Sequence, residues 1–483
     1  MNDGPIVEVL GADEAEVRQR RAAGALAAAG LEPGDRVAFV LPSSAALLCA
    51  VLGALRTGMV PVLLNATLVP TERELLLADA RPSLSIVDDG ALAALDRGTP
   101  VDLSPYPLAR PMHYTSGTTG RAKGVWTGIW DQPTAAAAFR DEADLWDFGP
   151  GDVHLVCSPM YHSVSIRFAA GTLMSGGTCV VLSRFDAAAA LAALSGKAGV
   201  LPTTTFMAPA ALHRLLSLGS ALPARFDSLR LLVHAGSPCP PVVKRAAMER
   251  VRPDVLWEFY GSTEGQFTAC SSAEWTERPG TVGRARVGRR LTVDDDGTVW
   301  CHPPSFARFL YWDDEAKTAA AWRDGSFTVG DIGRLDSDGY LFLDGRRDDL
   351  IISGGERLSR GGGGSPGRGS RGIGNRRVRA ARRDLGRAGV CRSSARSCRQ
   401  WSCGRWCCRR WCCRRWCRTR WCRRRRRLRC GPPPGSRRGP PGPVQAAEGV
   451  RRHPFPAPHG HGQAAATAGS RCARVRRRPM STR

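Results

Sequence analysis

The regular spacing of apolar residues stops at Arg357, and this break limits which part of the chain can form a packed core. Up to Arg357 the chain has 34 Lys and Arg against 42 acidic residues, a formal charge of −8. The 126 residues that follow have 35 Arg, no Lys and two acids, a formal charge of +33, and contain WCCRR repeats with a five-residue period from Trp406. Because no period of 3.6 or 2 persists there, we expect a packed core only in the first 357 residues.

Within that first part, Ala/Leu-rich helical segments alternate with short β-branched segments. The helix-like segments include 16–30 and 44–58, and the strand-like segments are 35–42, 60–65, 84–89, 152–159, 177–183, 229–236 and 254–262. Strand and helix in turn predict an α/β fold of parallel βαβ units, with ligands at the carboxyl ends of the strands. From Thr281 to Leu343, short strands with turn signals predict a small β-rich subdomain.

The composition excludes a small disulfide-stapled scaffold, because 483 residues are enough to bury a large core. The N-terminus MNDGPIVEVL lacks the basic start and apolar core of a signal peptide. The most apolar stretch, Ser43 to Leu64, is interrupted by Arg56 and Pro61, so no membrane span is expected. We therefore predict a cytoplasmic location, where the six cysteines of the first part stay reduced.

The strongest local motif is Tyr114-Thr-Ser-Gly-Thr-Thr-Gly-Arg-Ala-Lys-Gly124, which follows a short apolar segment. Glycines and hydroxyl residues packed this densely allow backbone N–H and side-chain O–H groups to converge on phosphate oxygens, and Lys123 adds a positive charge. The segment lacks the spacing of a Walker A loop. A flexible turn would explain any four of these residues, but eleven in this arrangement favour a phosphate-binding loop.

This segment resembles the phosphate loop of the adenylate-forming superfamily, which comprises acyl-CoA synthetases, luciferases and peptide-synthetase adenylation domains. Further matching stretches follow in the family's order: Tyr260-Gly-Ser-Thr-Glu264, Gly330-Asp-Ile-Gly-Arg334 with Asp338-Gly-Tyr340, and Gly345-Arg-Arg-Asp-Asp-Leu-Ile-Ile-Ser-Gly-Gly355. The resemblance covers about residues 31 to 357. It implies a large N-terminal adenylation domain over 1–344, a hinge and the start of a C-terminal domain over 345–357, and an aberrant tail over 358–483.

The resemblance also implies roles for individual residues. The ATP phosphates would be held by the loop residues Thr115, Ser116, Gly117, Thr118, Thr119, Gly120 and Lys123. Adenine would lie between Tyr260, with Gly261 beside it, and a wall formed by Ala235, Gly236 and Ser237. Thr263 would contact the α-phosphate, Glu264 would bind Mg²⁺, and Asp331 would bind the ribose hydroxyls with help from Arg346. Asp348 would be the hinge on which the C-terminal domain swings.

The implied reaction joins an acid and ATP into an acyl-adenylate and pyrophosphate, after which the thiol of coenzyme A forms a thioester. One position bears on the acid. In Pro159-Met-Tyr-His-Ser163, His162 stands where the amino-acid-activating branch usually has an Asp. Without that carboxylate an α-ammonium group has no evident partner, so the sequence resembles an acyl-CoA synthetase for fatty or other organic acids. His162 is expected to be either a gate to the acid pocket or a core residue.

The tail departs from the family pattern. The family's small C-terminal domain opens with an Ala-Glu-Val-Glu-like segment and carries a lysine in a Pro-Arg-Thr-x-x-Gly-Lys loop, yet no lysine occurs after Lys317. The overlapping frame, which reads bases two and three of each codon and base one of the next, is permitted to encode AEVEAVLGEAAGVSGTAVFGPPDETWGE over residues 360–387 and PRTATGK over 457–463. These matches favour a frameshift near Ser359 and an impaired enzyme.

Two other interpretations of the tail remain open. If the tail is a selected segment, the Arg run at 423–427 with interleaved Trp residues could bind nucleic acid through phosphate contacts and stacking. The protein would then be an ATP-site remnant with a basic binding tail. A metal site formed by the Cys pairs is the third interpretation, but the pairs lack the spacing of regular zinc knuckles.

Overall fold

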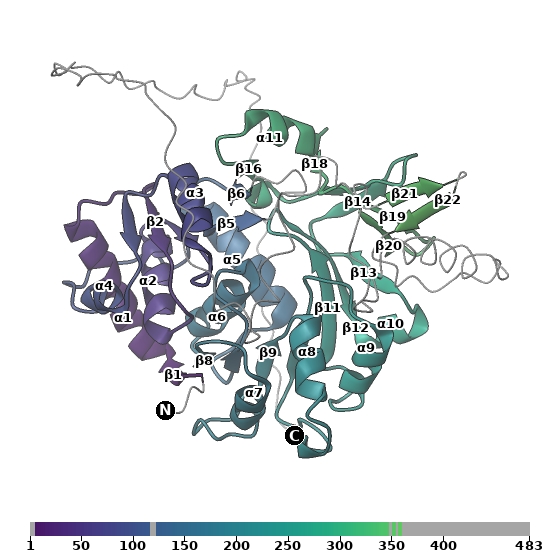
Figure 1. The fold of residues 1–483 in the computed structure, drawn as a ribbon, viewed down its shortest axis with the longest axis horizontal. Coiled ribbons are helices and arrows are strands. Elements are labelled where there is room, and N and C mark those ends of the chain that lie inside the picture. The colour runs from purple at the N-terminus through teal and green to yellow at the C-terminus, as the bar shows by residue number, and fades with distance from the viewer. Residues whose placement is uncertain (1–4, 116–121, 347–349, 354–355, 360–483) are drawn as a thin grey trace, which may run out of the picture. The chain divides into compact units, whose positions relative to one another are not determined.

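The computed structural model describes residues 5–115, 122–346, 350–353 and 356–359 (Figure 1). The helices in these ranges are α1 (Ala12–Ala28), α2 (Ala45–Arg56), α3 (Pro70–Ala80), α4 (Asp89–Leu95), α5 (Gln132–Trp146), α6 (Ser163–Met174), α7 (Ala187–Leu194), α8 (Pro209–Leu216), α9 (Pro241–Met248), α10 (Ser272–Glu277) and α11 (Glu315–Ala321), with short 3-10 helices at Gly219–Ala221 and Ser305–Ala307.

The largest sheet has ten strands among the described residues, in the order β1 (Val7–Gly11), β8 (Thr178–Leu182), β7 (Val153–Val156), β9 (Thr204–Phe206), β10 (Leu231–His234), β11 (Leu256–Gly261), β12 (Gln266–Ser271), β13 (Thr281–Ala285), β20 (Tyr340–Arg346) and β19 (Asp331–Leu335). The run from β8 to β11 is parallel, whereas β1 and the strands from β12 onward pair antiparallel to their neighbours.

The second sheet contains, in order, β16 (Leu310–Tyr311), β6 (Lys123–Trp126), β5 (Met112–Thr115), β3 (Val60–Leu63), β2 (Arg36–Phe39) and β4 (Leu84–Ile86). Its strands β5, β3, β2 and β4 are parallel. Two smaller sheets are formed by β14 (Arg290–Val293), β15 (Val299–His302), β18 (Ser326–Phe327) and β17 (Trp322–Arg323), and by β21 (Leu350–Ser353) with β22 (Glu356–Ser359).

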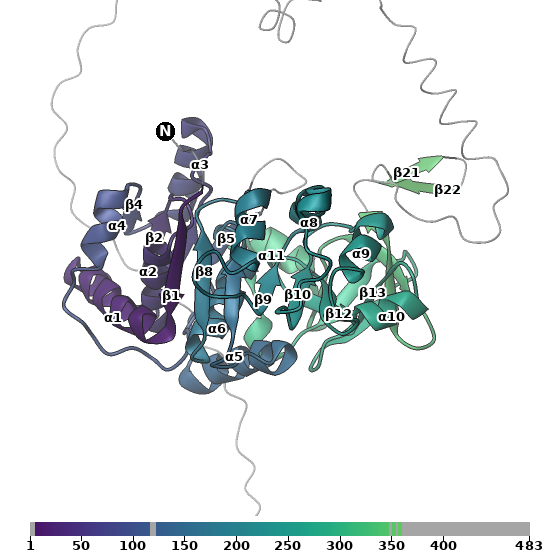
Figure 2. The same ribbon diagram turned by 90° about the horizontal axis from the view of Figure 1, so that it is seen from below.

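Alternation along the strands of the ten-stranded sheet separates two cores. On β10, Leu232 packs with residues of α7, α8 and α9, whereas Leu231 and Val233 pack with Trp146 and Phe168 of α5 and α6. Side chains of successive strand residues point to opposite faces, so each strand contributes to both cores. Figure 2 shows the same division, with α7 and α8 on one side of these strands and α5 and α6 on the other.

The predicted α/β fold is confirmed. The structure has a strand inside each of the segments predicted to be strand-like, and a helix in both 16–30 and 44–58. The β-rich segment from Thr281 to Leu343 is present but does not form one sheet: β14, β15, β17 and β18 pair together, while β13, β19 and β20 extend the ten-stranded sheet. Strand β1 lies outside the segments predicted to be strands and caps an edge of the large sheet by pairing with β8.

Two further expectations concern the described part of the chain. None of its helices is both long enough and apolar enough to span a bilayer. The cysteines up to Arg357 are all free thiols, and they are Cys49, Cys157, Cys179, Cys239, Cys270 and Cys301. Burial raises the pKa of the Cys157 thiol to about 12, which keeps it protonated and unreactive.

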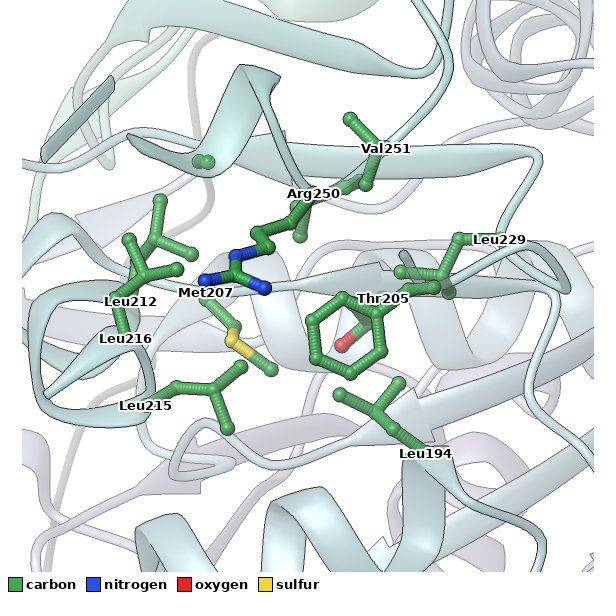
Figure 3. Close-up of a pocket in the computed structure, with 12 residues that line it drawn as sticks. Leu194, Thr205, Met207, Leu212, Leu215, Leu216, Leu229, Arg250 and Val251 are labelled. Carbon is green, nitrogen blue, oxygen red and sulfur yellow. The ribbon is translucent and has the colours of Figure 1, made fainter. Parts of the chain in front are cut away.

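A small cavity lies in the core between the ten-stranded sheet and helices α7, α8 and α9 (Figure 3). Leu side chains form half of its lining, and Figure 3 shows Arg250 and Met207 among the other lining residues. The cavity volume is about 10 Å³, about the space of one water molecule. The gap is therefore a packing defect of the core and too small for a substrate.

Candidate active site

The two ends of the predicted phosphate loop are held together by a β-hairpin. Thr115, the last residue of β5, pairs with Lys123, the first residue of β6, in an antiparallel register. The loop between them therefore starts and ends at one edge of the second sheet. Ser116, Gly117, Thr118, Thr119 and Gly120 were also predicted to contact phosphate, and they lie outside the described residues.

The structure connects Lys123 to Glu264 through one aromatic side chain, Tyr311. The Lys123 Nζ atom lies 4.8 Å from the centre of the Tyr311 ring, and the Tyr311 hydroxyl donates a hydrogen bond of 2.9 Å to Oε1 of Glu264. A polar cavity of about 20 Å³ opens beside this group, lined in part by Lys123, Tyr311, Asp314 and Lys317. Tyr311 thus contacts both the lysine of the loop and the predicted metal-binding carboxylate.

The predicted adenine wall follows β10 directly. Ala235 is buried, Ser237 is exposed, and Gly236 between them has φ of +91°, a backbone conformation that a side chain would strain. Parallel pairing places His234 of β10 beside Glu258 of β11, so the residues after both strands emerge at the same edge of the sheet. That edge carries the predicted nucleotide residues of both loops.

Tyr260 and Asp331 are in direct contact. The Tyr260 hydroxyl donates a hydrogen bond of 2.5 Å to Oδ2 of Asp331, and Nε of Arg346 lies 3.2 Å from Oδ1 of the same carboxylate. Burial, followed by the charge of Asp331, raises the pKa of Tyr260 well above its usual value, so the phenol remains a donor. Strands β19 and β20 create this contact, because their register pairs Asp331 with Arg346.

The other predicted residues are placed as follows. Gly261 is the last residue of β11, and a Cβ atom there would lie 2.8 Å from the Gly265 carbonyl oxygen, which explains why this tight turn needs glycine. Thr263 is half-buried in the turn before Glu264. His162 is exposed at the N-cap of α6, with its ring centre 4.5 Å from that of Tyr161. The predicted hinge residue Asp348 lies outside the described residues.

Glu264 suits the role of a magnesium ligand that shares the ion with substrate. Its side chain is 7% exposed, and one carboxylate oxygen is oriented by Tyr311. No group of three or more His, Cys, Asp or Glu side chains suited to a metal occurs in the part of the chain that the structure describes. Mg²⁺ usually binds through one or two carboxylates, substrate phosphates and water, so a single glutamate beside a phosphate loop fits this ion.

Two residues of this region were not predicted from the sequence. Tyr311 contacts Glu264 across 47 positions of the chain. Nδ1–H of His113 donates a hydrogen bond of 2.9 Å to the Tyr161 carbonyl oxygen, because a carbonyl oxygen can only accept. It fixes the turn that carries His162 beside the strand that leads into the phosphate loop. No local pattern in the sequence signals either contact.

We expect Tyr311→Phe to raise the Mg²⁺ concentration needed for ATP to stabilise the full chain, by about fivefold. The variant keeps the ring under Lys123 and removes only the hydrogen bond to Glu264, and such a bond contributes about 1 kcal/mol. The measurement is the melting temperature with ATP at increasing Mg²⁺. Tyr340→Phe is the matched control, because it removes a tyrosine–glutamate bond outside this site. Equal responses of both variants would contradict a positioning role for Tyr311.

A family model and several known proteins match this chain. The family described as "AMP-binding enzyme" matches residues 11–106 and 110–304, more than half of the chain. The chain is 28% identical over 384 residues to indoleacetate–CoA ligase of Aromatoleum aromaticum, covering 70% of this chain and 74% of that protein. It is 27% identical over 378 residues to long-chain-fatty-acid–CoA ligase FadD13 of Mycobacterium tuberculosis, covering 70% and 73%.

Solved structures give the same result for the fold. ATP-bound MatB from Rhodopseudomonas palustris superposes with a TM-score of 0.62 at 26% identity, covering 74% of this chain and 79% of that one. The o-succinylbenzoate CoA synthetase MenE from Bacillus subtilis, in complex with an acyl-adenylate intermediate, has a TM-score of 0.62 at 25% identity and coverages of 72% and 75%.

Proposed function

Because this chain belongs to the AMP-binding enzyme family, in the CoA-ligase branch of the adenylate-forming superfamily, we propose that it activates an organic acid at the site described above. The observation that carries the proposal is a pair of contact groups at one turn, because Tyr260 lies at the end of β11 and Glu264 lies in the turn that follows it. One joins Lys123, Tyr311 and Glu264, and the other joins Tyr260, Asp331 and Arg346. Together they offer cations, an oriented carboxylate and an aromatic ring to one nucleotide.

The chemistry proceeds in two steps. A carboxylate oxygen of the acid attacks the α-phosphorus of ATP, the bond to pyrophosphate breaks, and an acyl-adenylate forms. The sulfur of coenzyme A then attacks the acyl carbon, and AMP leaves. Lys123 and the hydroxyl of Thr115 are suited to phosphate charge, and Thr263 is suited to the α-phosphate. Glu264 would hold Mg²⁺, which would supply further stabilisation of that charge when bound.

The substrate is proposed to be a fatty or other organic acid and not an amino acid. The relatives' names cover indoleacetate, long-chain fatty acids, 2-succinylbenzoate, ferulate and 3-hydroxybenzoate, all of which lack an α-ammonium group. His162 stands at the position where an ammonium-binding carboxylate would be expected, and its side chain is exposed at the start of α6. Its proposed role is to gate the entrance for the acid.

We expect Mg·ATP, or a stable acyl-AMP mimic, to raise the melting temperature of the full chain. Ligand at about 100 times its Kd stabilises a folded protein by about 2.7 kcal/mol. Asp331→Asn and Glu264→Gln should each reduce the shift strongly, because each removes a charge from a group that the site orients. Differential scanning fluorimetry measures the effect.

Glu249→Gln is the matched control for this experiment, because Glu249 is an exposed carboxylate at the end of α9. It should leave the ligand-induced shift unchanged. If neither Mg·ATP nor the acyl-AMP mimic changes the melting temperature of the folded chain, the proposed function is wrong.

A further inference from the structure

A partly buried group of charged residues lies on the side of the ten-stranded sheet that α5 and α6 cover. We name it the arginine cluster, and it consists of Arg110, Arg167, Arg286 and Arg289 around Asp141 and Glu142. Arg289 binds both oxygens of Asp141, at 2.7 and 2.8 Å. Arg286 donates to Asp141 Oδ2 at 2.8 Å and to Glu142 Oε1 at 3.0 Å. These two guanidinium groups therefore satisfy most of the acceptors that the cluster offers.

Arg167 differs from Arg286 and Arg289, because two of its N–H groups have no hydrogen-bond acceptor in the described part of the chain. Its Nε forms an ion pair of 3.1 Å with Oε2 of Glu142, which also accepts a hydrogen bond of 3.0 Å from Trp146, but the orientation of Nε is not that of a hydrogen bond. Among the residues that the structure describes, the buried Nε and Nη2 of Arg167 have no hydrogen-bond partner. A buried donor without an acceptor costs about 1 to 3 kcal/mol, and native proteins rarely leave one without a reason.

The charge balance of the cluster points to a missing anion. Four guanidinium groups face two carboxylates, and within the described residues Arg110 has no carboxylate at ion-pair distance; its guanidinium instead lies 5.9 Å from the centre of the Trp130 ring. Burial, together with the nearby charge of Arg167, lowers the pKa of Arg110 to about 10. A buried surplus of positive charge is costly unless a negative group enters.

The unsatisfied guanidinium lies beside β11, the strand that carries Tyr260. Its central carbon is 5.1 Å from the ring centre of Phe259, and Phe259 directly precedes Tyr260 on β11. Phe259 also shares a core cluster with Ala235 of the adenine wall. On the helix side, Arg167 lies in the second turn of α6, whose N-cap is His162. Arg167 therefore lies between the entrance turn and the strand that carries the nucleotide residues.

We propose that the acid activated by this chain carries a second carboxylate, and that Arg167 binds it through Nε and Nη2. These two nitrogens form the fork that matches a carboxylate in a bidentate pair. The second carboxylate would supply the acceptor and the negative charge that the cluster lacks. The inference rests on the proposed function and adds the substrate class: dicarboxylic acids, of which one carboxylate is adenylated. Arg167 would then be a specificity-determining residue.

The test compares two stable acyl-adenylate mimics on the full chain by calorimetry and thermal shift. Both are acyl-sulfamoyl adenosines, and they are prepared as matched pairs with several acyl chain lengths. Within each pair the two acyl chains have equal length, but one ends in a carboxylate and the other in a methyl group. A hydrogen bond to a charged group contributes about 1.5 to 3 kcal/mol, so we expect the carboxylate mimic to bind at least about tenfold more tightly at the best length. Arg167→Met should abolish this preference and retain the affinity for the methyl mimic.

Two further variants separate specificity from folding. Arg167→Lys keeps the charge without the fork, so it should retain part of the preference and serves if Arg167→Met does not fold. Arg308→Met is the matched control, because Arg308 also lies over an aromatic ring, Trp322, but outside the cluster. Equal binding of both mimics to the unaltered chain, or equal weakening of both by Arg167→Met, would overturn the inference. Failure of Mg·ATP and every mimic to bind would overturn the proposed function and this inference with it.

Discussion

A chain in which the residues after Ser359 are replaced by the overlapping reading frame is expected to form acyl-CoA at least about 10² to 10³ times faster than the chain with its present tail. The present tail contains no lysine, whereas the overlapping frame is permitted to place a lysine at position 463 within a PRTATGK segment. A lysine that stabilises developing charge in the transition state typically contributes a factor of this size. Both chains are assayed by acid-dependent ATP–pyrophosphate exchange and by thioester formation.

The rebuilt chain also provides its own control. Replacing the lysine at position 463 of that chain by alanine should remove most of the gain in pyrophosphate exchange, but should leave thioester formation from added acyl-AMP largely intact. Loss of both activities would indicate a folding defect instead. The coding DNA gives an independent check, because a selected frame should stay free of stop codons from about Ser359 past Gln463.

Two outcomes would contradict this interpretation of the tail. One is acyl-CoA formation by the present chain at the rate of the rebuilt chain. The other is specific, salt-dependent nucleic-acid binding that is lost when the Arg residues at 423–427 are replaced, since phosphate contacts would then be a selected property of the tail. The second outcome would favour the remnant with a basic binding tail.

The sequence predicted the strands and loops that surround this site better than the side-chain contacts inside it. Alternation of helix and strand predicted the parallel core, and the strand ends predicted that Gly236 and Tyr260 lie at the same edge of the sheet. Such features depend on periodicity within a few residues, which a sequence displays directly. The division of the β-rich segment among separate sheets depends on which strands pair across long separations, and no local pattern encodes that choice.

The side-chain contacts inside the site could not be predicted from the sequence. Tyr311 belongs to a two-residue strand that no periodicity marks, yet it links the phosphate loop to Glu264. Arg167 is one of many arginines in the sequence, and only its buried position beside Glu142 and Phe259 distinguishes it. Both cases depend on burial and on partners far away in the chain. The resemblance to a family predicted which residues bind the nucleotide, but it did not predict the contacts of Tyr311 and Arg167.

The largest effect on stability is expected from Lys244→Met, about 3 to 5 kcal/mol of the free energy of unfolding. Lys244 on α9 donates a hydrogen bond of 2.6 Å to Oε2 of Glu258, with side chains only 1% and 10% exposed. Its ammonium also lies 4.7 Å from the ring centre of Trp275. Methionine fills a similar volume, but it leaves the Glu258 carboxylate buried without a cation, and breaking a buried pair in this way is costly.

Chemical denaturation of the full chain measures this loss, and two variants identify its cause. The double variant Lys244→Met with Glu258→Gln removes the orphaned charge and should recover much of the stability. Asp102→Asn breaks the exposed Arg20–Asp102 pair and should leave the stability almost unchanged. Since Glu258 pairs with His234 at the base of the adenine wall, the single variant should bind Mg·ATP more weakly as well. A single variant that loses as little stability as Asp102→Asn would show that this pair does not support the wall.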